Sequence, residues 1–453
     1  MSDIVTSALL RENFPESLFP DGYELIPDLK EIYELQLAYY EYKMLTSQEL
    51  SENGAFFASV EGKPTRHFEL CAGESLYLPE HSSGKRKSFF ESNIFRTGYG
   101  THGLFPYRGK FHPQMIKGII NIMGIKSGDT ILDPMMGSGT VPVEASLMGI
   151  HSIGVDASPF CSFMAKTKVD ALFMPLARVE KALNNSDKVF DYFSKKSHSP
   201  IKRNTKAKKF NSYESFREEE SKYLTSENDS PSLESDETKL THNLLLLTYL
   251  DSVGYAERSK RKSAKELFKG ILQRYFFVCE KAQDAISKTG ITLGKAQVST
   301  GDARHLEIES ESISGVLFSP PYSFAIDYIE NDSFHLNFFD VDLSNLRESM
   351  IGLRGGRLLM DKYECYKADL GQSLKECARV LKHGCICSIV IGTNSSQLSK
   401  IFRVPKDEVQ GLHELTAELG AANGLQLVKQ IERSIHGMSN TMRKEYIVML
   451  QKT

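Results

Sequence analysis

Cysteine is scarce in this sequence and is never spaced as in a typical metal site. Only seven cysteines occur among 453 residues, and no two of them form a Cys-x-x-Cys pair. The closest two, Cys385 and Cys387, lie in an apolar run that is typical of a strand. This distribution argues against disulfides and a zinc site, and it predicts a reduced, cytoplasmic protein without bound metal.

Long apolar runs and an excess of positive charge are also missing. The run LLLLTYL at residues 244–250 is far too short to cross a bilayer. The N-terminal MSDIVTSALLRENF has early acidic residues and no apolar core of a signal peptide, so no membrane association is expected. Because the net charge is -3, any contact with nucleic acid must use local basic patches.

The sequence does contain an α/β pattern, which begins near residue 111. Residues 111–156 read as a helix, a short strand, a glycine loop, a second helix and a second strand. Such a βαβ unit implies a parallel sheet. The pattern breaks at a basic and then acidic, Ser-rich stretch, residues 193–240, and resumes at residue 296. We therefore expect an α/β core that is split by an insertion of roughly 120 residues.

The loop LDPMMGSGT places two glycines, Gly137 and Gly139, between a strand and a helix, where backbone can approach a ligand closely. Asp156 follows about 20 residues later, at a strand end where a carboxylate can bind ribose hydroxyls. The nicotinamide fingerprint fails because Pro142 stands at the third glycine position, and no Gly-Lys-Ser/Thr ending of an ATP-binding loop is present. The pattern favours another nucleoside-bearing cofactor.

A second unusual stretch is LFSPPY, in which two prolines stop an apolar strand. Together with DPMMGSGT and GDAR, the Ser-Pro-Pro-Tyr tetrad resembles the DNA amino-methyltransferases over residues 101–170 and 291–453. These enzymes methylate exocyclic amines with S-adenosylmethionine. Serine at the first tetrad position is common among the cytosine-N4 enzymes, whereas Asp or Asn is commoner among the adenine-N6 enzymes.

The resemblance implies a class I, Rossmann-like methyltransferase with a mostly parallel sheet, an N-terminal extension and a helical insertion. The implied domains are 1–100, the extension; 101–170 and 291–453, the two parts of the core; and 171–290, the insertion, which is the candidate target-recognition region. The implied cofactor residues are Phe111, Asp133, Pro134, Gly137, Ser138, Gly139, Thr140, Asp156 and Asp302.

The implied catalytic residues are Ser319, Pro320, Pro321 and Tyr322. The Ser319 hydroxyl and the Pro320 carbonyl are expected to accept the two N–H groups of the target amine, so that its lone pair points at the methyl group. Two prolines hold these acceptors in a fixed turn. Tyr322 is expected to stack on a base that has left the duplex.

Contacts with double-stranded DNA are expected from basic residues outside the cofactor site. The candidates are Arg258, Lys260, Arg261 and Lys262 in the insertion, and Arg354 and Arg357 in a glycine-arginine loop. No nuclease motif is visible, so a restriction or defence partner would be a separate chain.

The sequence supports site-specific DNA methylation, preferably at cytosine N4, in a bacterial modification or defence system. Three alternatives remain open. The target could be adenine N6, or the substrate could be RNA methylated at guanine N2, because such enzymes share a similar tetrad. The chain could also be a non-catalytic cofactor-binding subunit of a DNA-targeting complex. The sequence gives neither the recognition site nor the oligomeric state.

Overall fold

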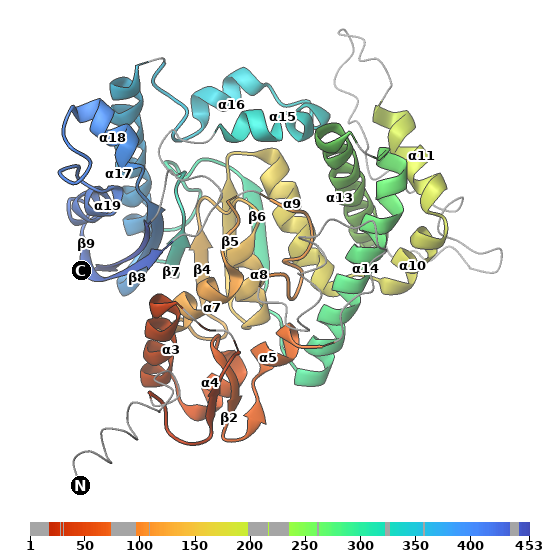
Figure 1. Ribbon diagram of the computed structural model, residues 1–453, viewed down its shortest axis with the longest axis horizontal. Helices are drawn as coiled ribbons and strands as arrows, with labels where there is room; N and C mark the ends of the chain where they lie inside the picture. The colour runs from red at the N-terminus through yellow and green to blue at the C-terminus, as the bar shows by residue number, and fades with distance from the viewer. Residues whose placement is uncertain are drawn as a thin grey trace, which may run out of the picture.

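The fold is described from a computed structural model (Figure 1). It describes residues 18–27, 29, 31–73, 97–107, 109–197, 216, 235–260, 262–321, 327–356, 358–434 and 444–453. Within these residues, no helix is both long enough and apolar enough to cross a bilayer.

A seven-stranded sheet forms the centre of the molecule. In spatial order its strands are β6 (Ala296–Thr300), β5 (His151–Asp156), β4 (Thr130–Asp133), β7 (Ile313–Phe318), β8 (Leu381–Gly392), β10 (Lys444–Lys452) and β9 (Leu425–Ser434). The neighbouring strands β6, β5, β4, β7 and β8 are parallel to one another. Strand β10 is antiparallel to both of its neighbours, β8 and β9. This is the doubly wound strand order with one antiparallel strand inserted before the last edge strand. It confirms the predicted class I, mostly parallel fold.

Helices cover both faces of the sheet, because successive side chains of a strand point to opposite faces. Ile131 of β4 packs with α7 (Pro113–Ile122), while the next residue, Leu132, packs with α17 (Leu359–Val380). The other helices of the core are α8 (Thr140–Leu147), α9 (Pro159–Asp170), α15 (Tyr328–Phe338), α16 (Leu343–Ser349), α18 (Ser395–Phe402) and α19 (Leu412–Ala421).

The predicted N-terminal extension packs against the α7 face and shares its interior. Its elements are β1 (Tyr23–Leu25), α3 (Ile32–Met44), α4 (Ser47–Asn53), β2 (Phe57–Val60), β3 (Lys63–Pro64) and α5 (Arg66–Cys71). Phe56 belongs to the same apolar cluster as Ile119 of α7. The buried Glu41 carboxylate accepts hydrogen bonds from the Ala55 amide at 3.0 Å and from Asn121 Nδ2 at 2.5 Å. The extension and the core are therefore one packed unit.

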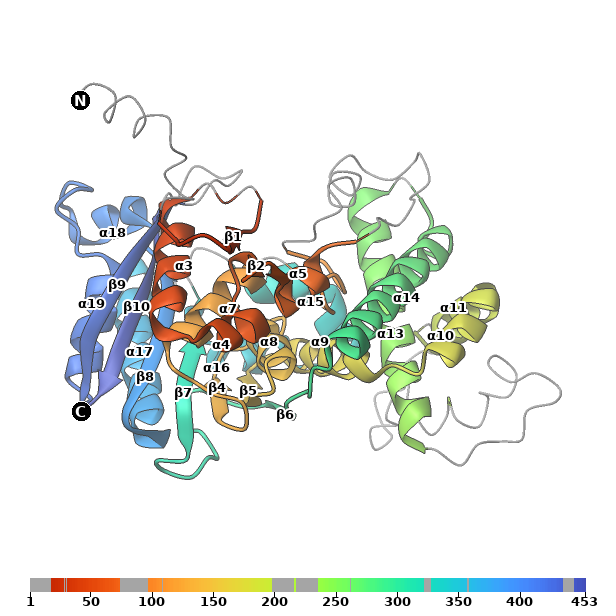
Figure 2. The same cartoon turned by 90° about the horizontal axis from the view of Figure 1, so that it is seen from below.

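The predicted insertion contains a short 3₁₀ turn and four helices in its described part. They are η1 (Ala171–Phe173), α10 (Leu176–Asn184), α11 (Ser186–Ser197), α13 (Ser235–Ser259) and α14 (Ala264–Thr289). Their apolar side chains form one cluster with residues of α9 and α15. A buried ion pair between Arg274 and Asp251, 2.9 Å long, joins α14 to α13. Figure 2 shows these helices on the side of the molecule opposite to α18 and α19.

Candidate active site

A cavity opens where the strand order of the sheet reverses. Strands β4 and β7 lie side by side at this point. From β4 the chain continues to β5 and β6 on one side of the sheet, and from β7 it continues to β8, β9 and β10 on the other side. In sheets of this kind, ligands bind at this point, beyond the carboxyl ends of the strands. The cavity has a volume of about 690 Å³ and is lined by residues that follow β4, β5, β6 and β7. This volume is typical of sites for cofactors and small molecules.

Most of the predicted cofactor and catalytic residues line this one cavity. Those from the cofactor set are Phe111, Pro134, Gly137, Ser138, Thr140, Asp156 and Asp302. Those from the catalytic set are Ser319, Pro320 and Pro321. Asp133 and Gly139 are buried and do not belong to the lining. Tyr322 lies outside the described residues.

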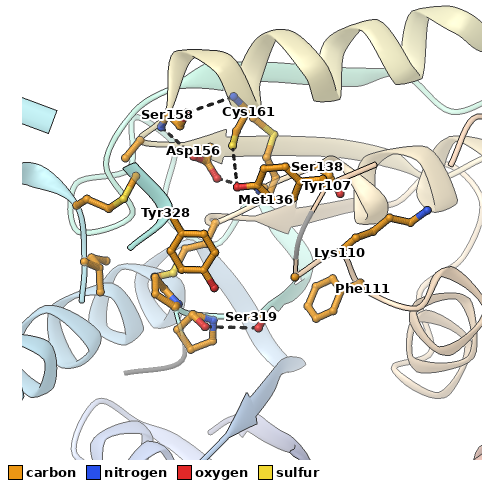
Figure 3. Close-up of a pocket in the computed structure, with 18 of the residues that line it drawn as sticks. Tyr107, Lys110, Phe111, Met136, Ser138, Asp156, Ser158, Cys161, Ser319 and Tyr328 are labelled. Atoms are coloured by element: carbon orange, nitrogen blue, oxygen red, sulfur yellow. Dashed lines mark hydrogen bonds between the residues drawn. The ribbon is translucent and has the colours of Figure 1, made fainter. Parts of the chain in front are cut away.

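Asp156, the last residue of β5, holds the glycine loop. Its carboxylate accepts hydrogen bonds from the Gly137 and Ser158 amides, each at 2.8 Å. Figure 3 shows Asp156 beside Ser158. Gly137 has a φ of 50°, in the left-handed region that glycine adopts without a steric penalty. Burial raises the pKa of Asp156, while the two amide donors act in the opposite direction. Each carboxylate oxygen has a second acceptor position, so a ligand hydroxyl can still donate to it.

Asp133, the last residue of β4, shows that the site can satisfy a hydrogen-bond donor. Its side chain is only 1% exposed, and Oδ1 accepts from the Met135 amide at 3.1 Å. Oδ2 has no hydrogen-bond partner among the described residues. Burial raises the pKa of Asp133 well above its usual range. An orphaned carboxyl oxygen is costly, and the next residue, Pro134, lines the cavity. The role of Asp133 as a cofactor residue stays a prediction.

Gly139 is constrained by packing against α9, which gives a stability prediction, while its role as a cofactor residue stays a prediction. Its φ is +79°, and an added Cβ would lie 2.6 Å from the Cβ of Ala165 on α9. We expect Gly139→Ala to lower the free energy of unfolding by about 2–4 kcal/mol, from backbone strain and overpacking together. Gly124→Ala is the matched control, because Gly124 has a φ of +75° and no atom within 4 Å of the added Cβ. Urea unfolding should show a smaller loss for the control, and equal losses would contradict the packing argument.

Asp302 is part of a partly buried charge network that reaches the glycine-arginine loop. Arg304 donates to Asp302 Oδ2 at 2.7 Å and to Asp369 Oδ1 at 2.8 Å, and it also donates to the Ser349 carbonyl. Arg354 donates to the same Asp369 oxygen at 2.8 Å. The predicted phosphate contact Arg354 is therefore tied into the wall of the site, although its side chain remains 37% exposed. Arg357 lies outside the described residues.

The proline turn places two oxygen acceptors at the end of β7. The Ser319 hydroxyl lies 3.5 Å from the Pro320 carbonyl oxygen, toward which it points in the structure. Pro320 is buried and Pro321 is half-buried, so the turn is embedded in the cavity wall. Both acceptors are close enough together to face one amino group.

The fold also brings to the cavity residues outside the predicted cofactor and catalytic sets. Tyr107 precedes α7, and its hydroxyl accepts a hydrogen bond from the Cys161 thiol at 3.4 Å. Tyr328 and Asp332, one turn apart on α15, also line the cavity. In Figure 3, Tyr328 lies between Asp156 on one side and Ser319 on the other. Asp332 was not predicted; its spacing of four residues from Tyr328 is the signal that could have placed it on the same face of the helix.

The basic residues of the insertion lie where α13 ends and the chain turns into α14. Arg258, in the last turn of α13, and Lys260 and Lys262, which follow it, are all exposed. Arg261 lies outside the described residues. The exposed side chains are available to solvent, and their role in DNA contact remains a prediction.

Comparison with known proteins identifies relatives of part of the chain. Residues 104–229 match the UPF0020 family, described as an RMKL-like methyltransferase domain. The type II methyltransferase M.BsoBI of Geobacillus stearothermophilus is 25% identical over 54% of this chain and 54% of its own length. The type II methyltransferase M.MjaII of Methanocaldococcus jannaschii is 47% identical over 15% of this chain and 13% of its own length.

A relative that acts on RNA matches a shorter segment. The tRNA (guanine(10)-N2)-dimethyltransferase of Methanothermobacter thermautotrophicus is 42% identical over 12% of this chain and 16% of its own length. None of these three relatives is covered over more than about half of its length.

Among solved structures, an S-adenosylmethionine-dependent methyltransferase of Methanosarcina mazei aligns with a TM-score of 0.31 and 10% identity. The alignment covers 72% of this chain and 94% of that one. The strand order of the sheet, rather than this alignment, establishes the fold. Strand order, glycine loop and family match together show that the chain contains a class I methyltransferase domain, whose cofactor is S-adenosylmethionine, with similarity to type II methyltransferases.

Proposed function

We propose that the protein methylates an exocyclic amine of a DNA base, preferably cytosine N4, at specific sites. The observation that carries this proposal is the position of the Ser319-Pro320 turn. It lies in the same cavity as the glycine loop and Asp156, at the ends of adjacent strands. The proposed acceptors for an amine and the proposed site for the methyl donor therefore line the same cavity.

The chemistry follows from the weakness of the nucleophile. The lone pair of an exocyclic amine is delocalised into the base ring. Acceptors directed at both N–H groups favour a pyramidal nitrogen, which localises the lone pair. Ser319 Oγ and the Pro320 carbonyl are such acceptors, and the prolines fix them before the substrate arrives. S-adenosylmethionine, when bound, supplies the methyl group as an electrophile on positively charged sulfur.

Two relatives support DNA as the substrate. The relatives M.BsoBI and M.MjaII are type II methyltransferases. A base that stays stacked inside a duplex cannot reach residues that line a cavity, so the proposal includes a flipped target base. We place the protein in a bacterial modification or defence system, with any restriction subunit as a separate chain. Serine, rather than Asp or Asn, at position 319 favours cytosine N4 over adenine N6.

Methylation of guanine N2 in RNA is the second candidate. It is favoured by the similarity to the tRNA (guanine(10)-N2)-dimethyltransferase. Guanine N2 is also an exocyclic amine, so the same two acceptors could serve it. The base and the nucleic acid must therefore be identified by experiment.

Radiolabelled methyl transfer tests the proposal directly. Purified protein is incubated with labelled S-adenosylmethionine and either unmethylated genomic DNA or total tRNA, and the digested nucleosides are identified by mass spectrometry. N4-methylcytosine is the expected product. N6-methyladenine would correct the base, and N2-methylguanosine in tRNA would replace the substrate. Cofactor binding without transfer to either nucleic acid would indicate a non-catalytic subunit.

The basic turn after α13 gives a prediction about DNA affinity. Lys260 and Lys262 are exposed, and we propose that they contact phosphates. Lys260→Gln/Lys262→Gln should weaken binding to all DNA sequences, because phosphate contacts carry no base information. The slope of log affinity against log salt should flatten by about 0.9 for each lost contact. If the variant and wild type had the same DNA affinity at every salt concentration, and therefore the same slope, this turn would be only a solvated surface.

A further inference from the structure

Asp332 is an acidic residue that faces the cofactor cavity and is used by none of the steps above. It lies on α15, and Tyr328, Ile329 and Leu336 of the same helix also line the cavity. Offsets of one, four and eight residues from Tyr328 place these side chains on one face of the helix. Asp332 is therefore held toward the cavity by the packing of α15 and not by a loose loop.

The charges of the cavity wall are unevenly paired. Asp302 is paired with Arg304, and Glu445 is paired with Arg433 at 2.7 Å. Asp156 and Asp332 also line the cavity, and neither forms an ion pair with a residue in the described ranges.

Lys110, a cation of the lining, donates to the carbonyls of Thr97 and His102 and not to a carboxylate. The lining therefore presents two carboxylates, Asp156 and Asp332, that are not paired with a cation of the lining.

We propose that Asp332 is a specificity residue that makes the cavity prefer the cationic S-adenosylmethionine over its demethylated product. The product S-adenosylhomocysteine keeps the same adenosine and amino acid but has a neutral thioether in place of the sulfonium. Shape therefore cannot distinguish the two molecules strongly, whereas a nearby carboxylate can. The proposal rests on the cofactor and not on the choice of DNA or RNA.

The surroundings of Asp332 make this preference depend on pH. The charged and titratable groups around it are Tyr107, Asp156, Cys161, Arg258 and Tyr328. Burial raises the pKa of Asp332 to about 7; a hydrogen bond with Tyr107 and the charge of Arg258 lower it, and the charge of Asp156 raises it.

The neighbouring acids other than Asp156 stay neutral near pH 7. Burial raises the pKa of Tyr107 and of Cys161 well above their usual ranges, and it raises the pKa of Tyr328 to about 12. At pH 7, about half of the Asp332 side chains therefore carry a proton in the free protein.

The sign of the effect follows from linkage. A cation in the cavity favours the ionised carboxylate, so its binding lowers the pKa of Asp332 and releases a proton. The affinity for S-adenosylmethionine should then rise by about tenfold between pH 6 and pH 8, as the fraction of ionised Asp332 rises. The affinity for S-adenosylhomocysteine should change by less than about twofold, because the neutral sulfur gains little from the charge.

Calorimetric titration of both ligands at pH 6 and pH 8 tests the proposal with wild type and Asp332→Asn. The variant should bind S-adenosylmethionine about tenfold more weakly at pH 8 and nearly as well as wild type at pH 6. Titration of the cofactor's own amino group is common to both proteins and cancels in the comparison. Glu330→Gln is the matched control, because Glu330 is an exposed acid of the same helix and should leave both affinities unchanged.

Two outcomes would overturn the proposal. Identical pH profiles for wild type and Asp332→Asn would remove Asp332 from cofactor recognition. Equal losses for the two ligands would mean that Asp332 contacts the shared sugar and does not sense the sulfonium.

If the Asp332→Asn variant does not fold, proton release measured with the wild-type protein alone tests the proposal. Titrations at pH 7 in buffers of different ionisation enthalpy should show release of about half a proton on binding S-adenosylmethionine, since about half of Asp332 is protonated there. Equal proton release with both ligands would contradict the charge preference. Failure of methyl transfer to DNA would leave these binding results unaffected.

Discussion

Ser319→Ala should slow methyl transfer by about 10²–10³-fold while leaving the affinity for S-adenosylmethionine unchanged. The magnitude is that of removing one pre-organised polar group from a reacting centre. The variant loses one of two acceptors, so the amine keeps more of its planar, delocalised character. The cofactor should still bind, because Asp156 and the glycine loop are joined by bonds that do not involve Ser319. Single-turnover rates at saturating cofactor, with calorimetric binding, measure the two quantities separately.

A serine on the same strand provides the control for this experiment. Ser314 lies near the amino end of β7, where its hydroxyl donates to Asp129 at 3.1 Å. Ser314→Ala should leave the rate of transfer close to wild type, because Ser314 does not line the cavity. A Ser319→Ala enzyme of wild-type rate would remove the hydroxyl from the mechanism and leave the Pro320 carbonyl as the only acceptor of the turn.

Asp156→Asn should weaken S-adenosylmethionine binding by roughly 30- to 1,000-fold, equivalent to about 2–4 kcal/mol. The change removes a charge and turns one acceptor into a donor. Asp156 accepts from both the Gly137 and Ser158 amides, so the new amide group must face one of them with its N–H. The glycine loop then loses a bond that fixes its shape, and the ligand loses a charged acceptor.

Asp170→Asn provides a matched control for this variant. Asp170 ends α9, which follows Asp156 in the chain, and it pairs with Lys166 outside the cavity. Its substitution should leave cofactor affinity within about twofold, because neither Asp170 nor Lys166 lines the cavity. An Asp156→Asn protein that is folded and binds the cofactor like wild type would show that the carboxylate serves only the loop.

The sequence was informative wherever a short motif sits at the end of a strand. DPMMGSGT and SPPY could be placed in one site because the carboxyl ends of parallel strands meet at one edge of a sheet. The residues that the sequence analysis missed come from segments whose contact depends on tertiary packing. Tyr107 and Cys161 are 54 positions apart, yet their side chains form a hydrogen bond. No local pattern marks such a pair.

For two residues that local patterns assigned to the site, the sequence could not show the neighbours that the packing gives them. Gly139 belongs to the glycine loop, but its close neighbour is Ala165 on α9. Arg354 stands in a glycine-arginine loop, a pattern that predicts a phosphate contact. In the structure its guanidinium donates a hydrogen bond to Asp369 on α17. In both cases the deciding partner lies on another element, and its position follows from the packing of helices on the sheet. Tyr322, Arg261 and Arg357 lie outside the described residues, so their roles stay predictions.

The order of strands along the chain has a consequence for synthesis on the ribosome. Strand β5 ends at Asp156, but its edge partner β6 begins only at Ala296, about 140 residues later. At ordinary translation rates of about 5–20 residues per second, the β5 edge remains without its partner for roughly 7–28 seconds. During this interval the nascent chain presents an open strand edge, a template for pairing with other chains. Slowed elongation between these two strands should therefore lower the yield of native protein more than slowing elsewhere in the chain.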